Sequence, residues 1–310
     1  MKFKNLQQLM DYFKGEKKCK AYLEKVRWNG EIKCPHCAHD KVYRLEKRFE
    51  CANKNCKKKF SVTSGTIFEN TKLSLRTWYA AFFLLTTSKK GISSVQLSVQ
   101  LGITQRTAWF LMHRVREVLR KGEDISLLNG LVEVDETYVG GKLKNKHKDK
   151  RKEGGQGRSL NDKTPVVGLV ERNGRVMTFI TENTNTETLH QIIDNNVAND
   201  AIIVTDGYKS YVGLDKKFMH VVVKHTDGNY IVQEGGRKFH TQNIENFWSI
   251  FKRGYIGIYH YMSKKHMHRY TVEFGFRYNT REETVQERFE RSLSNIKTRM
   301  RYKDLIQKTA

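Results

Sequence analysis

The most regular pattern of apolar and polar positions lies in residues 240–252. Apolar side chains recur there at i, i+3, i+4 and i+7, which predicts a helix that packs one face on a core: Ile244, Phe247, Trp248 and Phe251. Beside this stripe runs a polar one with Glu245 and Lys252, seven residues or about two turns apart. Taken alone, the polar stripe is typical of a solvated helix face. The alternative is an acid and a base presented together at a site.

Two upstream stretches predict strands that carry further acids. Residues 131–139 alternate, which places Glu133, Asp135 and Thr137 on one face and Glu136 on the other. This pattern does not decide which acid faces a site. The apolar run 201–205 predicts a buried strand that ends at Asp206, where a metal ligand and a turn residue are both common.

The elements between these acids predict a mixed α/β sheet over residues 128–265. An Asn-Gly turn within 172–174 joins strands 165–170 and 175–180 into a hairpin. A helix over 186–199 follows, and a strand over 220–224 precedes the helix that carries Glu245. Three strands, a helix, two strands and a helix are typical of a mixed sheet. The lysine-rich segment 142–163 is expected to be a basic loop, either a solubilising insertion or a phosphate clamp. Residues 266–310 are expected to form a helical extension packed on the sheet.

The first 70 residues are expected to hold two short helices and a zinc ribbon. Four cysteines form a C-x2-C and a C-x4-C pair around strand-like segments, a pattern that suits tetrahedral zinc: Cys34, Cys37, Cys51 and Cys56. Such a module binds DNA, contacts another subunit or braces its neighbour. Lysines beside the last cysteine, Lys57 and Lys58 among them, favour a phosphate contact.

Residues 71–127 predict helices only. A short helix, a turn around Gly102 and a helix capped by Thr104 resemble a helix-turn-helix. Gln105, Arg106 and Arg114 are expected on the exposed part of the second helix, which enters the major groove in such motifs. The alternative is a plain helical hairpin.

The amino-acid composition indicates which class of molecule the protein binds. The chain has 310 residues, 57 Lys and Arg against 33 Asp and Glu, and a net charge of +24, which favours a polyanion. No run of 18 apolar residues occurs and the first ten residues lack the apolar core of a signal peptide, so we expect a cytoplasmic protein that acts on nucleic acid rather than on a membrane. In that compartment, paired cysteines are expected to bind metal rather than form disulfides.

Asp135, Asp206 and Glu245 suit one chemistry. Carboxylates bind hard cations such as Mg²⁺ or Mn²⁺ together with water and substrate phosphates. Two such ions can activate an attacking oxygen and stabilise a leaving one. Lys252 would then hold a phosphate nearby, and Glu133 and Glu136 would serve as controls for Asp135.

Several segments together resemble one family, the IS1595 transposases of bacterial insertion sequences with an ISXO2-like DDE domain. They are the cysteine pattern and residues 22–28, 88–93, 107–109, 133–141, 205–208, 240–252 and 273–279, in family order. One departure is the four-residue spacing within the second cysteine pair, where two residues are usual.

The resemblance implies an RNase H-like catalytic fold and cut-and-join transposition at terminal inverted repeats. It implies that Asp135, Asp206 and Glu245 are the DDE triad and bind magnesium, that Lys252 is the basic residue that follows it, and that the protein forms a homo-oligomer on DNA. Two alternatives are a catalytically idle DNA-binding regulator, which need not retain three acids, and an RNase H-like nuclease, which has less need of two N-terminal DNA-reading modules.

Overall fold

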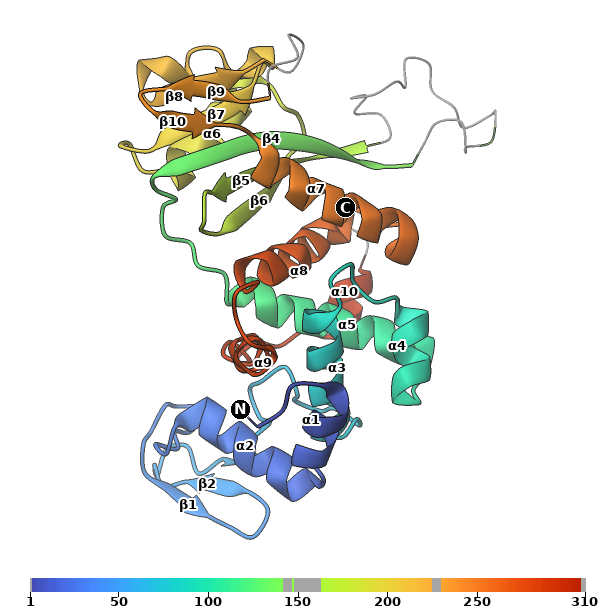
Figure 1. Ribbon diagram of the computed structural model, residues 1–310. Coiled ribbons are helices and arrows are strands. Elements are labelled where there is room, and N and C mark those ends of the chain that lie inside the picture. Colours follow the sequence, from blue (N-terminus) through green and yellow to red (C-terminus); the bar gives the residue numbers. More distant parts are fainter. Residues whose placement is uncertain (1, 142–146, 148–162, 225–229, 308–310) are drawn as a thin grey trace. The chain divides into compact units, whose positions relative to one another are not determined.

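The computed structural model describes residues 2–141, 147, 163–224 and 230–307. The chain forms two compact units, one of residues 1–123 with 282–310 and one of residues 124–281 (Figure 1). We refer to them as the first and second unit. The expected basic loop 142–163 lies almost wholly outside the described residues. In the described part of the chain, no helix combines the length and the apolar character needed to cross a bilayer.

The first unit is built around a helix that is buried on most of its surface. This helix, α3 (Leu75–Thr87), has nine buried residues and begins at Ser74, whose side chain accepts a hydrogen bond from the N–H of Thr77. Other helices of this unit are α1 (Leu6–Tyr12), α2 (Glu16–Trp28), α9 (Val285–Ser292) and α10 (Tyr302–Ile306).

The two helices that the sequence predicts around Gly102 are present. Helix α4 (Ser94–Leu101) ends at Gly102, whose φ of +63° lies in the left-handed region that glycine tolerates. Helix α5 (Gln105–Lys121) begins at Thr104, whose side chain accepts from the N–H of Thr107.

The ribbon is a three-stranded antiparallel sheet of β1 (Val42–Arg44), β2 (Phe49–Cys51) and β3 (Lys59–Phe60). A module with so few residues cannot bury a large core. The aromatic rings of Trp28, Phe49 and Phe60 pack together in it. The ring centroid of Phe49 lies 5.4 Å from Trp28 and 5.5 Å from Phe60.

The second unit contains the mixed five-stranded sheet. Its strands are β4 (Leu131–Gly140), β5 (Lys163–Glu171), β6 (Val176–Ile180), β7 (Ile202–Asp206) and β8 (Met219–Val223), in the order β6-β5-β4-β7-β8. Strand β5 pairs antiparallel with β4 and β6, whereas β7 pairs parallel with β4 and β8. The predicted hairpin turn is present, with Asn173 at a φ of +62°. A small hairpin of β9 (Val232–Glu234) and β10 (Arg237–Phe239) was not predicted.

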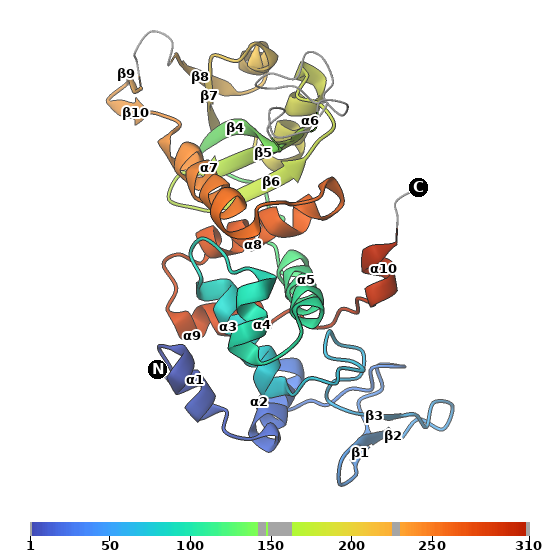
Figure 2. The same ribbon diagram turned by 90° about the vertical axis from the view of Figure 1, so that its right-hand side faces the viewer.

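Helices cover both faces of this sheet (Figures 1 and 2). Helix α6 (Thr186–Asn196) packs Leu189 and Ile193 on the face that carries Val132 and Val134. Helices α7 (Gln242–Gly254) and α8 (Met267–Asn279) pack on the opposite face. All four residues of the predicted apolar stripe are buried there: Ile244, Phe247, Trp248 and Phe251.

The C-terminal prediction is corrected. Residues 266–310 were expected to pack as one extension on the sheet, but only α8 belongs to the second unit, which runs to Arg281. Residues 282–310 belong to the first unit, because Phe289 of α9 packs its ring 5.4 Å from Phe3 and 5.7 Å from Tyr79. The regions 1–70 and 71–127, which were expected to be separate, both belong to the first unit, except that residues 124–127 belong to the second.

Candidate functional site

Two of the three candidate acids lie side by side at the ends of neighbouring parallel strands. The register pairs Leu131 with Ile202 and continues to Glu133 and Val204. Asp135 lies four residues after Leu131, and Asp206 lies four residues after Ile202. The two acids are therefore at the same position along their parallel strands and on the same face of the sheet, just beyond the last paired residues. The sheet register thus brings together two carboxylates that are far apart in the sequence.

The third acid comes from α7, which approaches the sheet closely at a glycine. Gly168 on β5 pairs with Asp135 on β4. A Cβ atom on Gly168 would lie 2.6 Å from Cζ2 of Trp248 and 2.7 Å from Cδ1 of Ile244. Only glycine therefore lets α7 pack at this distance, and Glu245 follows Ile244 in the first turn of the helix.

One hydrogen bond orients a carboxylate oxygen of each acid. The N–H of Glu136 donates to Asp135 at 2.9 Å, and the N–H of Tyr208 donates to Asp206 at 3.0 Å. The hydroxyl of Thr241 donates to Oε1 of Glu245 at 2.7 Å. The bond to Asp206 is that of a turn residue, so this interpretation of Asp206 is confirmed, and its role as a metal ligand stays a prediction.

The charges at Asp135 repel one another. Burial, together with the nearby carboxylates of Glu136, Asp206 and Glu245, raises the pKa of Asp135 to about 7. A divalent cation relieves such repulsion, because it stabilises the ionised form that burial and like charges disfavour.

The donor chemistry fits Mg²⁺ or Mn²⁺ held with water. Among the described residues, the four cysteines form a group of side chains placed to hold a metal ion, and the three acids do not form such a group by themselves. Magnesium is commonly bound by one or two carboxylates, with water and substrate phosphates at its other positions. The acids suit this shared ligation better than a closed protein cage.

Lys252 is exposed near the other end of α7. It lines a hollow of about 610 Å³ together with Lys163, Phe251 and Tyr255. A cation in such a hollow can hold a phosphate on the helix that carries Glu245.

Glu133 has a structural role that the sequence did not indicate. Its side chain is wholly buried, and Oε2 accepts the backbone N–H groups of Asn243 at 2.8 Å and Ile244 at 3.2 Å. Oε1 accepts the Asn243 side-chain amide at 2.8 Å and Nη2 of Arg172 at 3.0 Å. Glu133 therefore caps the N-terminus of α7 from β4, favourably placed at the positive end of the helix dipole. Its use as a silent control for Asp135 is wrong, because it joins the two elements that carry Asp135 and Glu245.

Glu136 lies on the opposite face of β4. Its Oε2 accepts the hydroxyl of Tyr211 at 2.8 Å, and burial next to this carboxylate raises the pKa of Tyr211 far above its ordinary value. Among the acids of β4, the alternation places Asp135 and Glu133 on the α7 side and Glu136 on the α6 side.

The four cysteine sulfurs form one cluster in the ribbon. All lie within 4.8 Å of one another, with Cys34 and Cys56 3.9 Å apart and Cys37 and Cys51 3.5 Å apart. Zn–S bonds of about 2.3 Å in a tetrahedron put sulfurs about 3.8 Å apart. The longer spacing of the second cysteine pair thus leaves the cluster suited to structural zinc.

We expect about one zinc ion per purified chain, the stoichiometry of a site with four thiolates. Removing it with a chelator should unfold the ribbon, because the free energy of zinc binding is part of the folding free energy of so small a module. Elemental analysis and circular dichroism before and after chelation measure both effects. A zinc-free protein with an intact ribbon would contradict the assignment, and Cys19→Ser is the matched control because this buried cysteine lies outside the cluster.

The candidate DNA-binding side chains of the first unit differ in exposure. Gln105 and Arg106 are exposed at the start of α5, where Gln105 donates to Ser94 and Arg106 to the hydroxyl of Tyr302. Lys57 and Lys58 are exposed between Cys56 and β3.

The expected exposure of Arg114 is wrong. Its side chain is buried, and the guanidinium carbon lies 4.7 Å from the ring centroid of Trp78 and 5.2 Å from that of Phe110. Burial lowers its pKa to about 10. Arg114 lies on the side of α5 that packs on α3, so it stabilises the unit rather than facing a groove.

Two segments of the chain match models of transposase domains. Residues 127–279 match the ISXO2-like transposase domain, and residues 14–59 match the transposase zinc-ribbon domain. A protein in transposable element ISH50 of Halobacterium salinarum is 28% identical over 256 residues, which cover 78% of this chain and 83% of that protein. A transposase-like protein of Haemophilus influenzae is 31% identical over 114 residues, 35% of this chain and 84% of its own length.

A solved structure gives a much weaker similarity. The Mos1 transposase paired-end complex with the left transposon end is 12% identical, covers 68% of this chain and 78% of its own, and has a TM-score of 0.22. A score this low carries no argument about the fold, so the assignment rests on the sequence matches.

Proposed function

Because the chain belongs to the IS1595 family of transposases, we propose that it cuts and joins DNA strands at the terminal inverted repeats of its own element. The observation that carries this proposal is the level placement of Asp135 and Asp206 on parallel strands, with the Glu245 helix packed at Gly168 on the same face. Strand order and directions support an RNase H-like second unit.

In the proposed mechanism, Asp135, Asp206 and Glu245 would hold the divalent cations. When bound, these ions supply activation of the attacking oxygen and stabilisation of the leaving oxygen in phosphodiester cleavage. Thr241 orients Glu245 through its hydroxyl, and Lys252 positions a phosphate of the DNA strand. The attacking oxygen belongs to water in strand cutting and to a DNA 3′-hydroxyl in strand joining.

The first unit supplies DNA binding in this proposal. Gln105 and Arg106 at the start of α5 read base edges, and Lys57 and Lys58 contact phosphates. Two DNA ends must be brought together before joining, so we propose that the protein acts in the cytoplasm as a homo-oligomer on DNA.

A strand-joining assay tests the proposal. The full-length protein, Mg²⁺ and labelled duplexes ending in the inverted repeats that flank the gene should yield joined products, whereas shuffled ends should not. Cleavage without joining, independent of the end sequence, would indicate a nuclease instead. Binding to the ends with neither reaction would indicate a DNA-binding regulator.

A further inference from the structure

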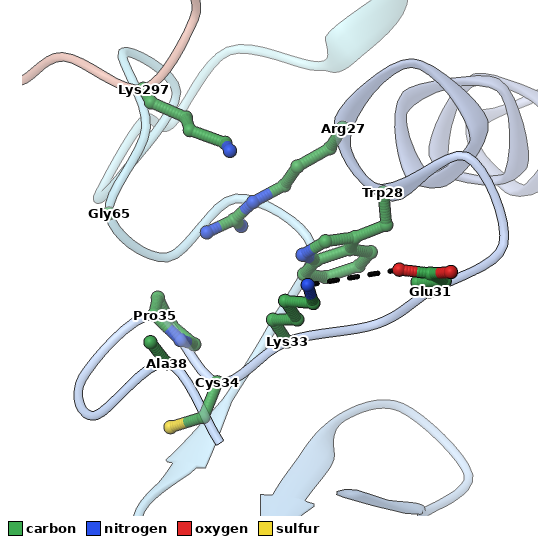
Figure 3. A pocket seen from close by; sticks show the side chains of 9 residues that line it. All are labelled: Arg27, Trp28, Glu31, Lys33, Cys34, Pro35, Ala38, Gly65 and Lys297. Atoms are coloured by element: carbon green, nitrogen blue, oxygen red, sulfur yellow. Dashed lines mark ion pairs between the residues drawn. The ribbon is translucent and has the colours of Figure 1, made fainter. Parts of the chain in front are cut away.

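A hollow of about 430 Å³ lies next to the ribbon in the first unit (Figure 3). Its wall is formed by the end of α2, the first cysteine knuckle, the loop at Gly65 and the segment before α10. Side chains of three cations line it: Arg27, Lys33 and Lys297. It is separate from the acids of the second unit and has no part in the proposed chemistry.

The charge in this hollow is unbalanced. Among the described residues, the acid that lines it is Glu31, whose side chain is 84% exposed and lies 3.7 Å from Lys33. An ion pair so exposed to water contributes little. The carboxylate of Glu69 lies beside the hollow, where it accepts the N–H of Gly65 at 3.1 Å and lies 3.7 Å from Arg299. Lys297 is also exposed, and Figure 3 shows its ammonium group directed toward the guanidinium of Arg27. Arg27 and Lys297, which are far apart in the sequence, therefore both line this hollow, although their like charges repel.

Arg27 is held in place before any ligand binds. Nη1 donates to the carbonyl oxygen of Val62 at 2.7 Å, and the guanidinium carbon lies 4.6 Å from the ring centroid of Trp28. Burial lowers its pKa to about 10, which leaves it charged at neutral pH. A fixed, partly desolvated guanidinium binds an anion at a lower entropic cost than a mobile surface lysine.

A glycine keeps the opposite wall open. Gly65 has a φ of +72°, and an added Cβ would lie 3.4 Å from Cβ of Pro35 and 3.7 Å from Nη2 of Arg27. A larger residue here would be strained and would extend toward the guanidinium. Backbone therefore forms this wall.

We propose that this hollow is a phosphate-binding site that holds one backbone phosphate of the DNA, between Arg27 and Lys297. Three cations line it against one acid, and the neighbouring carboxylate of Glu69 has Arg299 as a partner, so an acceptor-only anion matches the hollow. The identification of the anion as DNA rests on the proposed function, whereas free inorganic phosphate has the same chemistry.

Salt-dependent binding of a labelled duplex tests the site in the full-length protein. Each neutralised phosphate contributes about −0.9 to the slope of log K against log salt. Lys297→Ala should weaken binding and make the slope shallower by about that amount, and Lys297→Arg should restore both. Lys303→Ala is the matched control, because Lys303 is an exposed lysine of the same C-terminal segment outside the hollow.

A second measurement separates the two sources of phosphate. Titration with inorganic phosphate should shift the indole N–H resonance of Trp28 in the wild type and less in Lys297→Ala, whereas chloride at equal ionic strength should not. Equal salt slopes for the wild type and Lys297→Ala would overturn the proposal. If the wild type binds no DNA, the proposed function fails, and the phosphate titration alone then decides whether the hollow binds an anion.

Discussion

Replacing Asp135, Asp206 or Glu245 by alanine should each abolish strand cutting and joining while DNA binding stays close to that of the wild type. In the proposed mechanism, the reaction needs cations that the three carboxylates would hold together. We expect a loss of at least about 10²-fold, the scale measured for single electrostatic groups in active sites. Binding rests on the basic first unit, and removing an acid makes the chain more positive. Joining yield and duplex affinity, measured on the same preparations, show the separation.

The matched control for Glu245 is Glu187→Ala, since both acids lie exposed in the first turn of a helix in the second unit. This control should join at the wild-type rate. Lys252→Ala should lose less activity than the triad variants, because it positions a phosphate and holds no cation. Full Mg²⁺-dependent joining by all three triad variants would require the DDE mechanism to be abandoned.

Glu133→Ala should strongly destabilise the second unit. It leaves the half-buried Arg172 without its carboxylate, and it removes the fully buried acceptor of two N–H groups at the start of α7. Breaking a buried ion pair on one side costs about 3–5 kcal/mol. Thermal unfolding measures this loss, and joining should fall with it because the α7 terminus carries Glu245.

A positioning role for Glu133 needs a variant that folds. Glu133→Gln keeps one acceptor oxygen and the shape of the side chain, so the unit should remain folded with α7 less firmly held. We expect kcat for joining to fall while KM for the DNA ends stays unchanged, at temperatures well below unfolding. Glu187→Gln is the control, since it makes the same change at an exposed acid of α6 in the second unit. Undiminished kcat in folded Glu133→Gln would contradict the positioning role.

Local pattern was enough to predict most elements of this protein. The stripe from Ile244 to Phe251, the cap at Thr104 and the turn at Asn173 depend on residues within a few positions of one another, so they can be read along the chain. The cysteine cluster was also predictable, because zinc ligation depends on residue type and close spacing. The family resemblance, now supported by the domain matches, added the roles of the three acids.

Other features depend on contacts between distant residues. The level placement of Asp135 and Asp206 depends on the β4–β7 register, and the docking of α7 depends on Gly168 of another strand. Arg114 carries a charge that predicts exposure, yet two aromatic rings and burial against α3 override it. Phe289 draws residues 282–310 to the first unit, although their sequence follows the second.

Glu133 is a single residue for which the sequence predicted some features and only the tertiary structure determined others. Its alternation with Asp135 determined its face of the strand, and by charge alone it was one more acid beside a candidate ligand. Only the tertiary structure placed the N–H groups of Asn243 and Ile244 against its carboxylate, 110 and 111 residues away in the chain. A hydrogen bond needs both partners within about 3 Å, so the sequence could determine the acid and its face, while the packing of α7 on the sheet decided its partners.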